Sequence, residues 1–449
     1  MKTNKNQPSL TRASRRTVMK GVLAGSLLTP FGLVHLRAQE DSQMSNSSPL
    51  TSASHTQGIS DNEIVLGTSA AFTGPSRGLG IELYRGAMAY FQHVNENGGV
   101  HGRKIVLKLY DDTYNADPAV ENTMKLMLED QVFALFGYVG TPTVTRVLPL
   151  LKKFQEQEFV LFFPFTGAQP QRQPPYGPFA FNLRASYRQE TAGLVNNFVG
   201  IGRKKIGVFY QADAYGRSGW AGVREALSKH HLKIVGEVTY KRGEKFTNSY
   251  EAQVERLNRD KPEAVICIGA YAACAGFLRD AVDGDLKVPI ANLSFVGSEN
   301  LLKLIMDSQE DPGQYSRYLV NSQVVPSYED LSLAGIAQYD DFMQKYNPGL
   351  PTQWADSDYK TFDRSFVSLE GFINARLMTE ILQRIGPEPT RGKIEEAVFT
   401  IDNLDLGIGE MVSFNEARRQ GLDRVYYTIV DRDKNVFVPL REGEWAKVF

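Results

Sequence analysis

Short apolar segments alternate with amphipathic segments along most of this chain, and that alternation restricts the fold more than any other feature of the sequence. Residues 132–136 (VFALF), 159–163 (FVLFF) and 264–268 (AVICI) are continuous apolar runs, which is typical of strands buried on both faces. Between such runs, apolar residues such as Leu83 and Ala87 recur at helical spacing. Buried strands separated by helices predict parallel β-α units with helices on both faces of each sheet.

The pattern starts a second time near the middle of the chain. Ser186 and Gln189 form a capping-box sequence that predicts a helix start, and a new series of strands begins at residues 205–210. Residues 425–431 and 435–440 indicate a closing hairpin. A chain of 449 residues exceeds what a single hydrophobic core usually supports. The expected fold class is therefore α/β, with two successive doubly wound units.

The first 60 residues have the composition of an export signal followed by a tether. The run Ser14-Arg15-Arg16-Thr17-Val18-Met19-Lys20 precedes an uncharged stretch over residues 21–36, and an arginine pair in this context is typical of a twin-arginine export signal. A membrane anchor is the alternative, which the short apolar run and Pro30 disfavour. We expect a signal peptide over residues 1–38 and a flexible leader over residues 39–60.

The charge balance argues against a nucleic-acid partner. The chain has 50 basic and 51 acidic side chains, and seven of the basic ones lie in the first 38 residues, which contain no Asp or Glu. The remainder therefore holds 43 basic and 51 acidic side chains, a net charge of −8. Because phosphate binding requires clustered Lys and Arg, we expect no nucleic acid among the partners. After the signal, no apolar run is long enough to span a membrane.

Residue types that commonly carry catalysis or bind metals are sparse. No nucleophile elbow occurs, and no phosphate-binding loop ending in Gly-Lys-Ser/Thr. The acid pair Asp111-Asp112 ends a strand, where a solvated or capping role is favoured over a metal or acid/base role. Four histidines follow the leader, without metal-ligand spacing: His93, His101, His230 and His231. We therefore expect no enzyme activity, no cofactor and no metal.

The two cysteines exclude a disulfide-scaffolded fold. Cys267 lies on an expected strand and Cys274 on the helix that follows it. A disulfide across that turn is the alternative, but its geometry is demanding. A protein that folds in the cytoplasm before twin-arginine export has reduced thiols, so two buried free cysteines are favoured.

Polar and aromatic residues gather in the loops after the expected strands. In open α/β sheets, ligands bind outside the carboxyl ends of the strands, and the backbone N–H groups that start a helix suit a carboxylate. Thr141-Pro142 opens such a helix, although Thr141 could be only its N-cap. The candidate ligand-binding residues are Tyr138, Gly140, Thr141, Phe165, Thr166, Gly167, Asp213, Tyr215, Tyr271, Ser294 and Phe295.

Five stretches of the chain follow one another in a characteristic order and spacing: GTSAAFTGP (67–75), NENGGVHGR (95–103), YDDTYNADP (110–118), FNLRAS (181–186) and QADAYG (211–216). Together they resemble the leucine/isoleucine/valine-binding group of type I periplasmic binding proteins. That resemblance implies two doubly wound lobes joined by a three-crossover hinge, with crossovers near residues 183–185, 324–327 and 409–414. We expect lobe I over residues 61–184 and 325–410, and lobe II over 185–324 and 411–449.

The resemblance also assigns roles to some candidates. Thr141 matches the family's hydroxyl contact to the ligand carboxylate, the Phe165–Gly167 loop matches the next contact region, and Tyr215 and Tyr271 match binding tyrosines. The family's amino-acid binders place an acidic residue after the next strand to pair the α-ammonium, but here that loop is Leu-Ser-Phe-Val-Gly and Glu299 comes later. An α-amino acid would need another partner, for which Asp213 is a candidate; an aromatic or aliphatic carboxylate, or an amide, would also suit the aromatic lining.

The resemblance therefore implies the periplasmic substrate-binding component of an ABC importer. We expect it to capture a small carboxylate-bearing solute by hinge closure, to act as a monomer in the periplasm, and to pass the solute to an inner-membrane ABC permease. The alternative within the same fold is a ligand-sensing module for a signalling partner. A second rival is a periplasmic cofactor enzyme, since twin-arginine export carries prefolded proteins.

Overall fold

The computed structural model describes residues 57–308 and 311–449. The expected signal peptide, residues 1–38, and residues 39–56 of the expected leader lie outside the described residues. Over the described ranges, no helix is both long enough and apolar enough to cross a bilayer.

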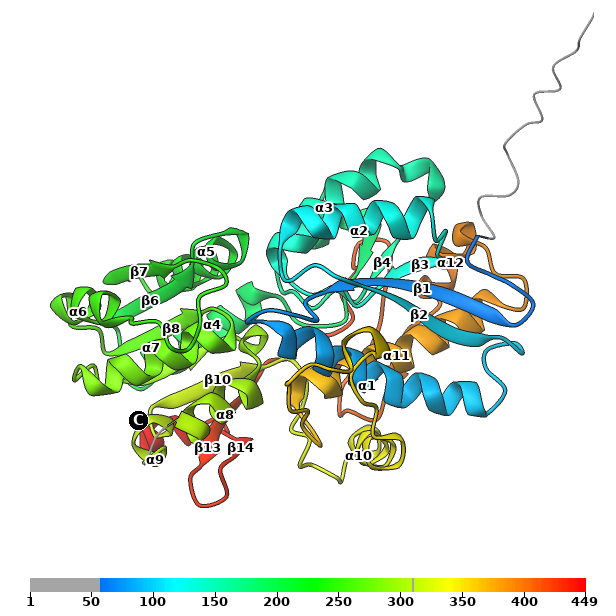
Figure 1. Cartoon of the computed structure of the whole chain (residues 1–449). Helices are drawn as coiled ribbons and strands as arrows, with labels where there is room; N and C mark the ends of the chain where they lie inside the picture. The colour runs from blue at the N-terminus through cyan, green and yellow to red at the C-terminus, as the bar shows by residue number, and fades with distance from the viewer. Residues whose placement is uncertain (1–56, 309–310) are drawn as a thin grey trace, which may run out of the picture. The chain divides into compact units, whose positions relative to one another are not determined.

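A five-stranded parallel sheet forms the first half of the fold, in the order β2-β1-β3-β4-β5. Its strands are β1 (Glu63–Ala70), β2 (Lys104–Asp111), β3 (Ala134–Phe136), β4 (Leu161–Phe162) and β5 (Ala180–Phe181). Helices α2 and α3 cover one face and α1 and α11 the other, with α10 packed on α1 (Figure 1). These helices are α1 (Arg77–Glu96), α2 (Ala116–Leu128), α3 (Thr141–Lys153), α10 (Ala334–Tyr346) and α11 (Phe366–Ile385).

The cores on the two faces of this sheet explain the apolar runs. Successive residues of a strand point to opposite faces. Leu135 and Leu161 join a cluster under α2 and α3, whereas Ala134, Phe136 and Phe162 join the larger core on the α1 side. Because both faces are covered, each residue of such a strand must be apolar, which confirms the expected arrangement of buried parallel strands.

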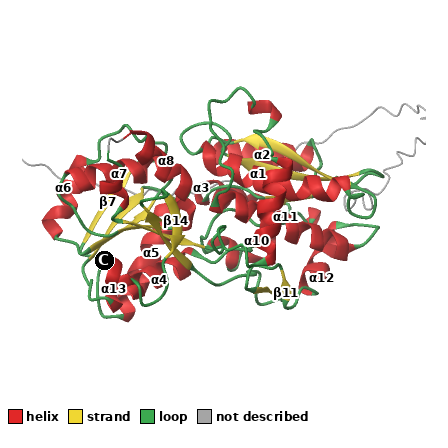
Figure 2. Cartoon of the chain, turned by 90° about the horizontal axis from the view of Figure 1, so that it is seen from below, coloured by secondary structure: helices red, strands yellow, loops and turns green. Residues whose placement is uncertain are grey.

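A seven-stranded sheet forms the second half, in the order β14-β13-β10-β9-β8-β6-β7. Five strands are parallel, and β13 and β14 form the expected antiparallel hairpin. Helices α4 and α5 lie on one side of it and α6, α7 and α8 on the other (Figure 2). The strands are β6 (Ile206–Gln211), β7 (Gly236–Tyr240), β8 (Ala264–Ile268), β9 (Ile290–Asn292), β10 (Leu319–Gln323), β13 (Tyr426–Asp431) and β14 (Val436–Pro439); the helices are α4 (Tyr187–Gly200), α5 (Ala214–Lys229), α6 (Glu251–Asp260), α7 (Tyr271–Asp283) and α8 (Ser298–Ser308).

The five parallel strands follow the same order in both sheets. β2-β1-β3-β4-β5 in the first sheet corresponds to β7-β6-β8-β9-β10 in the second. In each, the strand order reverses at one point, between β1 and β3 and between β6 and β8. Ligands in open α/β sheets bind at this switch point, outside the carboxyl ends of the strands. The loops after these strands are therefore the first place to look for a site.

The helix starts agree only in part with those predicted from the sequence. The expected capping box at Ser186 and Gln189 is confirmed, since each side chain bonds the other's backbone N–H. The N-cap of α3 is Gly140, so Thr141 is the first helical residue and not the cap. Likewise α2 starts at Ala116, one residue before the expected cap, Asp117.

Several short elements were not expected from the sequence. They include α9 (Gly313–Ser316), α12 (Ile394–Phe399), α13 (Trp445–Val448), β11 (Leu404–Asp405) and β12 (Met411–Val412). Segments this short show no periodicity from which a helix or strand can be recognised.

Candidate ligand-binding site

Three hydroxyl groups meet where the first sheet ends and α4 begins. Thr141 opens α3, Thr166 lies in the loop after β4, and Tyr187 opens α4. The Oγ1 atoms of Thr141 and Thr166 are 2.6 Å apart, and the Tyr187 hydroxyl lies 3.3 Å from Thr141 Oγ1. All three side chains are buried. Hydroxyls can donate or accept, and two of these stand at helix N-termini, where an anion is stabilised.

The two candidate glycines are required by close contacts with aromatic rings. A Cβ on Gly140 would lie 2.2 Å from the ring of Tyr114, and the φ of Gly140 is +111°. A Cβ on Gly167 would lie 2.5 Å from the ring of Tyr187. These glycines therefore let aromatic side chains approach the backbone beside the hydroxyl cluster.

Aromatic rings from both halves adjoin these hydroxyls. Tyr215, in the first turn of α5, has its ring centroid 5.0 Å from that of Tyr187 and 4.6 Å from that of Phe295. Phe165 lies 5.4 Å from Phe295. Burial raises the pKa of Tyr215 well above its usual value. Its buried hydroxyl has no hydrogen-bond partner among the described residues, so it is available to bond an ordered water molecule or a ligand.

A buried arginine lies behind this aromatic group. The Arg184 guanidinium stacks 4.5 Å from the Phe165 ring centroid and donates a hydrogen bond to the Ser294 hydroxyl. It also lies 3.7 Å from a carboxylate oxygen of Glu190 and 3.6 Å from one of Glu370. Burial raises the pKa of Glu370 to about 7, against the opposing effect of Arg184. Arg184 Nε has no hydrogen-bond partner within the described residues.

Two candidate residues have other partners. The Tyr138 ring packs in the core under α2 and α3, and its hydroxyl is 3.0 Å from Thr123 Oγ1; it therefore does not join Thr141 and Thr166. Asp213 caps α5 by accepting from the Tyr215 N–H at 2.9 Å, and its carboxylate is 3.3 Å from Arg242. An ammonium group would have to compete with Arg242 for it.

Two other carboxyl groups noted in the sequence hold loops together. Asp111 Oδ1 accepts from the backbone N–H of Phe72 and of Thr113, both at 2.9 Å. Glu299 accepts from the Phe366 N–H at 3.1 Å, and burial raises its pKa to about 7. A group of His, Cys, Asp or Glu side chains able to hold a metal ion does not occur over residues 57–308 and 311–449. Cys267 and Cys274 are both buried and free.

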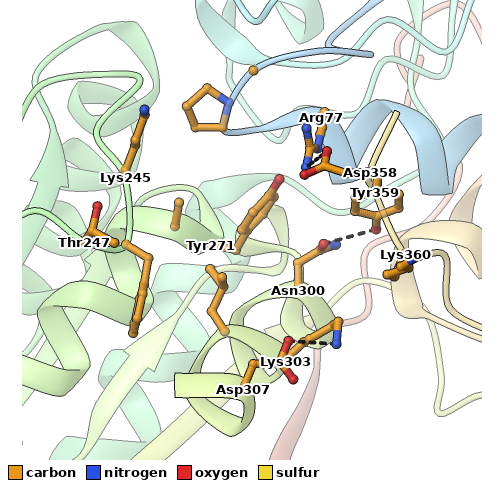
Figure 3. Close-up of a pocket in the computed structure, with 15 residues that line it drawn as sticks. Arg77, Lys245, Thr247, Tyr271, Asn300, Lys303, Asp307, Asp358, Tyr359 and Lys360 are labelled. Atoms are coloured by element: carbon orange, nitrogen blue, oxygen red, sulfur yellow. Dashed lines mark hydrogen bonds and ion pairs between the residues drawn. The ribbon is translucent and has the colours of Figure 1, made fainter. Parts of the chain in front are cut away.

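A cavity of about 660 Å³ adjoins Tyr271. Tyr271 opens α7, and its hydroxyl accepts a hydrogen bond of 3.1 Å from the Gly78 N–H, in the first turn of α1. Figure 3 shows Tyr271 and Asn300 between Lys245 and Thr247 on one side and Arg77, Asp358, Tyr359 and Lys360 on the other. Burial raises the pKa of Tyr271 to about 12, so its hydroxyl stays protonated near neutral pH.

Sequence reasoning missed Tyr187 and Arg184, although both left a signal. Tyr187 follows the correctly identified cap Ser186, in the same position relative to its helix as Thr141 and Tyr271. Arg184 belongs to the FNLRAS stretch. Its role depends on Glu370, which is far away in the sequence and reaches it only through the fold.

The chain is similar to known binding proteins over most of its length. A family model described as "Periplasmic binding protein" matches residues 63–435. Among solved structures, that of a possible leucine/isoleucine/valine-binding protein from Rhodopirellula baltica superposes with a TM-score of 0.74 and 28% identity. The superposition covers 87% of this chain and 98% of that one.

Curated relatives match a smaller part. An amino acid binding protein of Pseudomonas aeruginosa is 26% identical over 220 residues, which are 48% of this chain and 56% of the relative. A leucine-specific-binding protein of Salmonella typhimurium is 22% identical over 283 residues, 60% of this chain and 72% of the relative. The chain thus spans just over half the length of the first of these relatives.

Proposed function

Because this chain belongs to the type I periplasmic binding proteins of the leucine/isoleucine/valine-binding type, we propose that it is the substrate-binding component of an ABC importer. The solute is a small molecule that bears a carboxylate: a branched-chain or other amino acid, an amide, or an aromatic acid. One observation carries this proposal. Polar and aromatic groups from the strand ends of both sheets meet around Tyr215, whose buried hydroxyl lacks a partner among the described residues.

In this proposal the carboxylate is received by Thr141, Thr166 and Tyr187. In the structure their hydroxyls bond one another, so a carboxylate exchanges neutral hydrogen bonds for charge-assisted ones, which contribute about 1.5–3 kcal/mol each. The start of α3 adds its helix dipole. Phe165, Phe295 and Tyr215 provide an apolar wall for the rest of the solute.

Hinge closure would couple binding to a change of shape. Moving a two-state equilibrium from 1:99 to 99:1 requires about 5.5 kcal/mol of differential binding, which a few such hydrogen bonds supply. Contacts between the two halves support this mechanism, because they would be lost on opening. They are Gly78 N–H to Tyr271 hydroxyl at 3.1 Å, Tyr359 hydroxyl to Asn300 Oδ1 at 3.1 Å, and Gln211 Nε2 to Tyr114 hydroxyl at 3.3 Å.

We also propose the lobe boundaries drawn from the sequence: residues 61–184 with 325–410, and residues 185–324 with 411–449. Sheet membership supports this division, since β1–β5 form one sheet and β6–β10 with β13 and β14 form another. Packing of α10 and α11 on α1 also supports it.

The proposed setting is the periplasm, after export by the twin-arginine pathway. In this proposal the partner is an inner-membrane ABC permease and the protein is a monomer. It binds and releases its solute without catalysing a reaction. The family's binding role supports this setting.

The test is a calorimetric titration of protein that has been unfolded and refolded to release co-purified solute. Titrants are amino acids, their amides, and aliphatic and aromatic carboxylates, guided by mass spectrometry of the solutes released. We expect one class to bind with a micromolar or lower Kd. If no carboxylate, amino acid or amide produces heat or raises Tm, the proposed function is wrong.

A further inference from the structure

The cavity beside Tyr271 has an unbalanced charge. Its lining contains four basic side chains, Arg77, Lys245, Lys303 and Lys360, and two acidic ones, Asp307 and Asp358. The basic residues come from the start of α1, the loop after β7, α8 and the segment between α10 and α11. The cavity is therefore lined by residues from both halves of the fold (Figure 3).

Both acidic residues of this lining are already paired. Arg77 Nη2 lies 2.7 Å from Asp358 Oδ1, and Lys303 Nζ lies 2.8 Å from Asp307 Oδ2. The opposite charges within each pair cancel. The charges of Lys245 and Lys360, on opposite sides of the cavity, are not cancelled in this way. Neither of their ammonium groups has an ion-pair partner over residues 57–308 and 311–449. The cavity thus carries an excess of two positive charges, which concentrates anions in a cleft with low-dielectric walls.

The base of the cavity can accept a polar solute. Tyr271 and Asn300 are 93% and 94% buried, with exposed fractions of 7% and 6%. Asn300 Oδ1 accepts from the Tyr359 hydroxyl at 3.1 Å, whereas its Nδ2 group donates to no atom of the described residues. Because Asn300 lines the cavity, this free donor is available to a solute that brings a hydrogen-bond acceptor.

Among the described residues, no unpaired carboxylate lines this cavity. Asp307 and Asp358 are paired within it, and Glu82, which accepts a hydrogen bond from Tyr359, is paired with Arg85 at 2.9 Å. Outside the lining, Asp213 is paired with Arg242 at 3.3 Å. An unpaired ammonium in a cleft costs several kcal/mol, and two free lysines would add to that cost by repulsion.

We propose that the cleft selects solutes of net negative charge, namely carboxylates that lack an α-ammonium group, over zwitterionic amino acids. This inference rests on the proposed function and narrows its solute class. Thr141, Thr166 and Tyr187 hold the carboxylate, as in the proposed function, and Lys245 and Lys360 act on it only through their field. Asn300 can donate to another acceptor atom of the solute.

The first experiment compares four solutes with one carbon skeleton: 4-methylpentanoate, 4-methylpentanamide, leucine and leucinamide, titrated calorimetrically into refolded protein at low and high salt. A second pair, 3-phenylpropanoate and phenylalanine, tests an aromatic body. We expect each carboxylate to bind about tenfold or more tightly than its amino acid, and this preference to shrink as salt is raised. If leucine or phenylalanine binds as tightly as its carboxylate, the inference is wrong while the proposed function stands. If no titrant binds, both are wrong.

The second experiment uses lysine variants. Lys245→Ala and Lys360→Ala should each raise the Kd of the carboxylate about two- to fivefold, as expected for exposed charges, and the double variant more, with little change for the amide. Lys233→Ala, an exposed lysine outside the cavity, is the matched control. A double variant whose carboxylate Kd equals that of Lys233→Ala would overturn the inference.

Discussion

The hydroxyl of Tyr271, at the start of α7, accepts a hydrogen bond of 3.1 Å from the backbone N–H of Gly78, in the first turn of α1. This bond joins the loop after β8 in the second sheet to the helix that follows β1 in the first. A Cβ at Gly78 would lie 2.5 Å from Asn300 Oδ1, so the approach also requires glycine. The two halves therefore meet through side-chain and backbone groups at both switch points.

Replacing this hydroxyl tests whether the contact favours the ligand-bound form. Tyr271→Phe keeps the ring but leaves the Gly78 N–H without its partner, at a cost of about 0.5–1.5 kcal/mol. We expect the solute Kd to rise about two- to tenfold by calorimetry. Tyr315→Phe is the control, because the Tyr315 hydroxyl bonds Asp283 at 3.0 Å within the second half. Equal effects of the two variants would contradict the expectation.

Removing a hydroxyl from the proposed carboxylate site should weaken solute binding more than Tyr271→Phe does. Thr141→Val and Thr166→Val each delete one donor while keeping the shape of the side chain, and a lost hydrogen bond to a charged group costs about 1.5–3 kcal/mol. We expect the Kd to rise about ten- to a hundredfold. Thr145→Val, one turn along α3, removes only bonds to the carbonyls of Thr141 and Pro142 and should leave the Kd within about twofold. An unchanged Kd in Thr166→Val would count against the assignment.

Arg184 is expected to matter for stability. In Arg184→Met, Glu190 and Glu370 would lose their buried partner, and such losses cost about 3–5 kcal/mol. Urea denaturation monitored by circular dichroism should show this decrease in the free energy of unfolding. Arg188→Met breaks an exposed pair with Glu225 at 3.4 Å and should cost less than about 1 kcal/mol. Comparable losses in the two variants would show that the buried cluster is not a stabilising unit.

Stability should fall as the pH rises through neutrality. Burial raises the pKa of Glu299 in the folded protein to about 7, from a usual value of 4.5. The folded state therefore binds this proton more strongly than the unfolded state, and the resulting stability is fully present below pH 4.5 and is lost as the pH rises through about 7. Each pH unit in this window costs about 1.4 kcal/mol for one such carboxyl.

The Glu299→Gln variant isolates this contribution. The amide stays neutral and can still accept from the Phe366 N–H, so its Tm should fall less steeply between pH 5 and pH 7 than that of the parent. Glu255→Gln, on the exposed side of α6, should follow the parent. Parallel Tm curves for Glu299→Gln and the parent would show that Glu299 titrates normally.

Much of the fold could be predicted because its signals are local. The strand predicted at residues 264–268 is β8 within the same bounds, and the capping box at Ser186 and Gln189 is present. Helix boundaries differ from the predicted ones where the backbone conformation required at one residue outweighs the local sequence pattern. Gly140 became the cap of α3 because its φ of +111° and its contact with Tyr114 suit glycine alone.

The candidate site was predicted less completely. The loops after the strands were found because chain order alone places them at strand ends. Tyr138 lies in the correct loop, but its side chain turns into the core under α2 and α3. Neighbouring residues of an extended segment point to opposite sides, and only the packed sheet decides which side faces the other half.

The sequence by itself determined the repeated strand–helix units, the capping box at Ser186 and Gln189 and the absence of familiar catalytic motifs, since each depends on residues close together in the chain. The tertiary structure alone decided which distant groups became neighbours. In the folded protein Arg184 lies beside Glu370, and Asp213 forms an ion pair with Arg242. Lys245 and Lys360 line opposite sides of one cavity. Electrostatic interactions depend on the distance between charged groups and on their burial, and neither can be deduced from the order of residues in the chain.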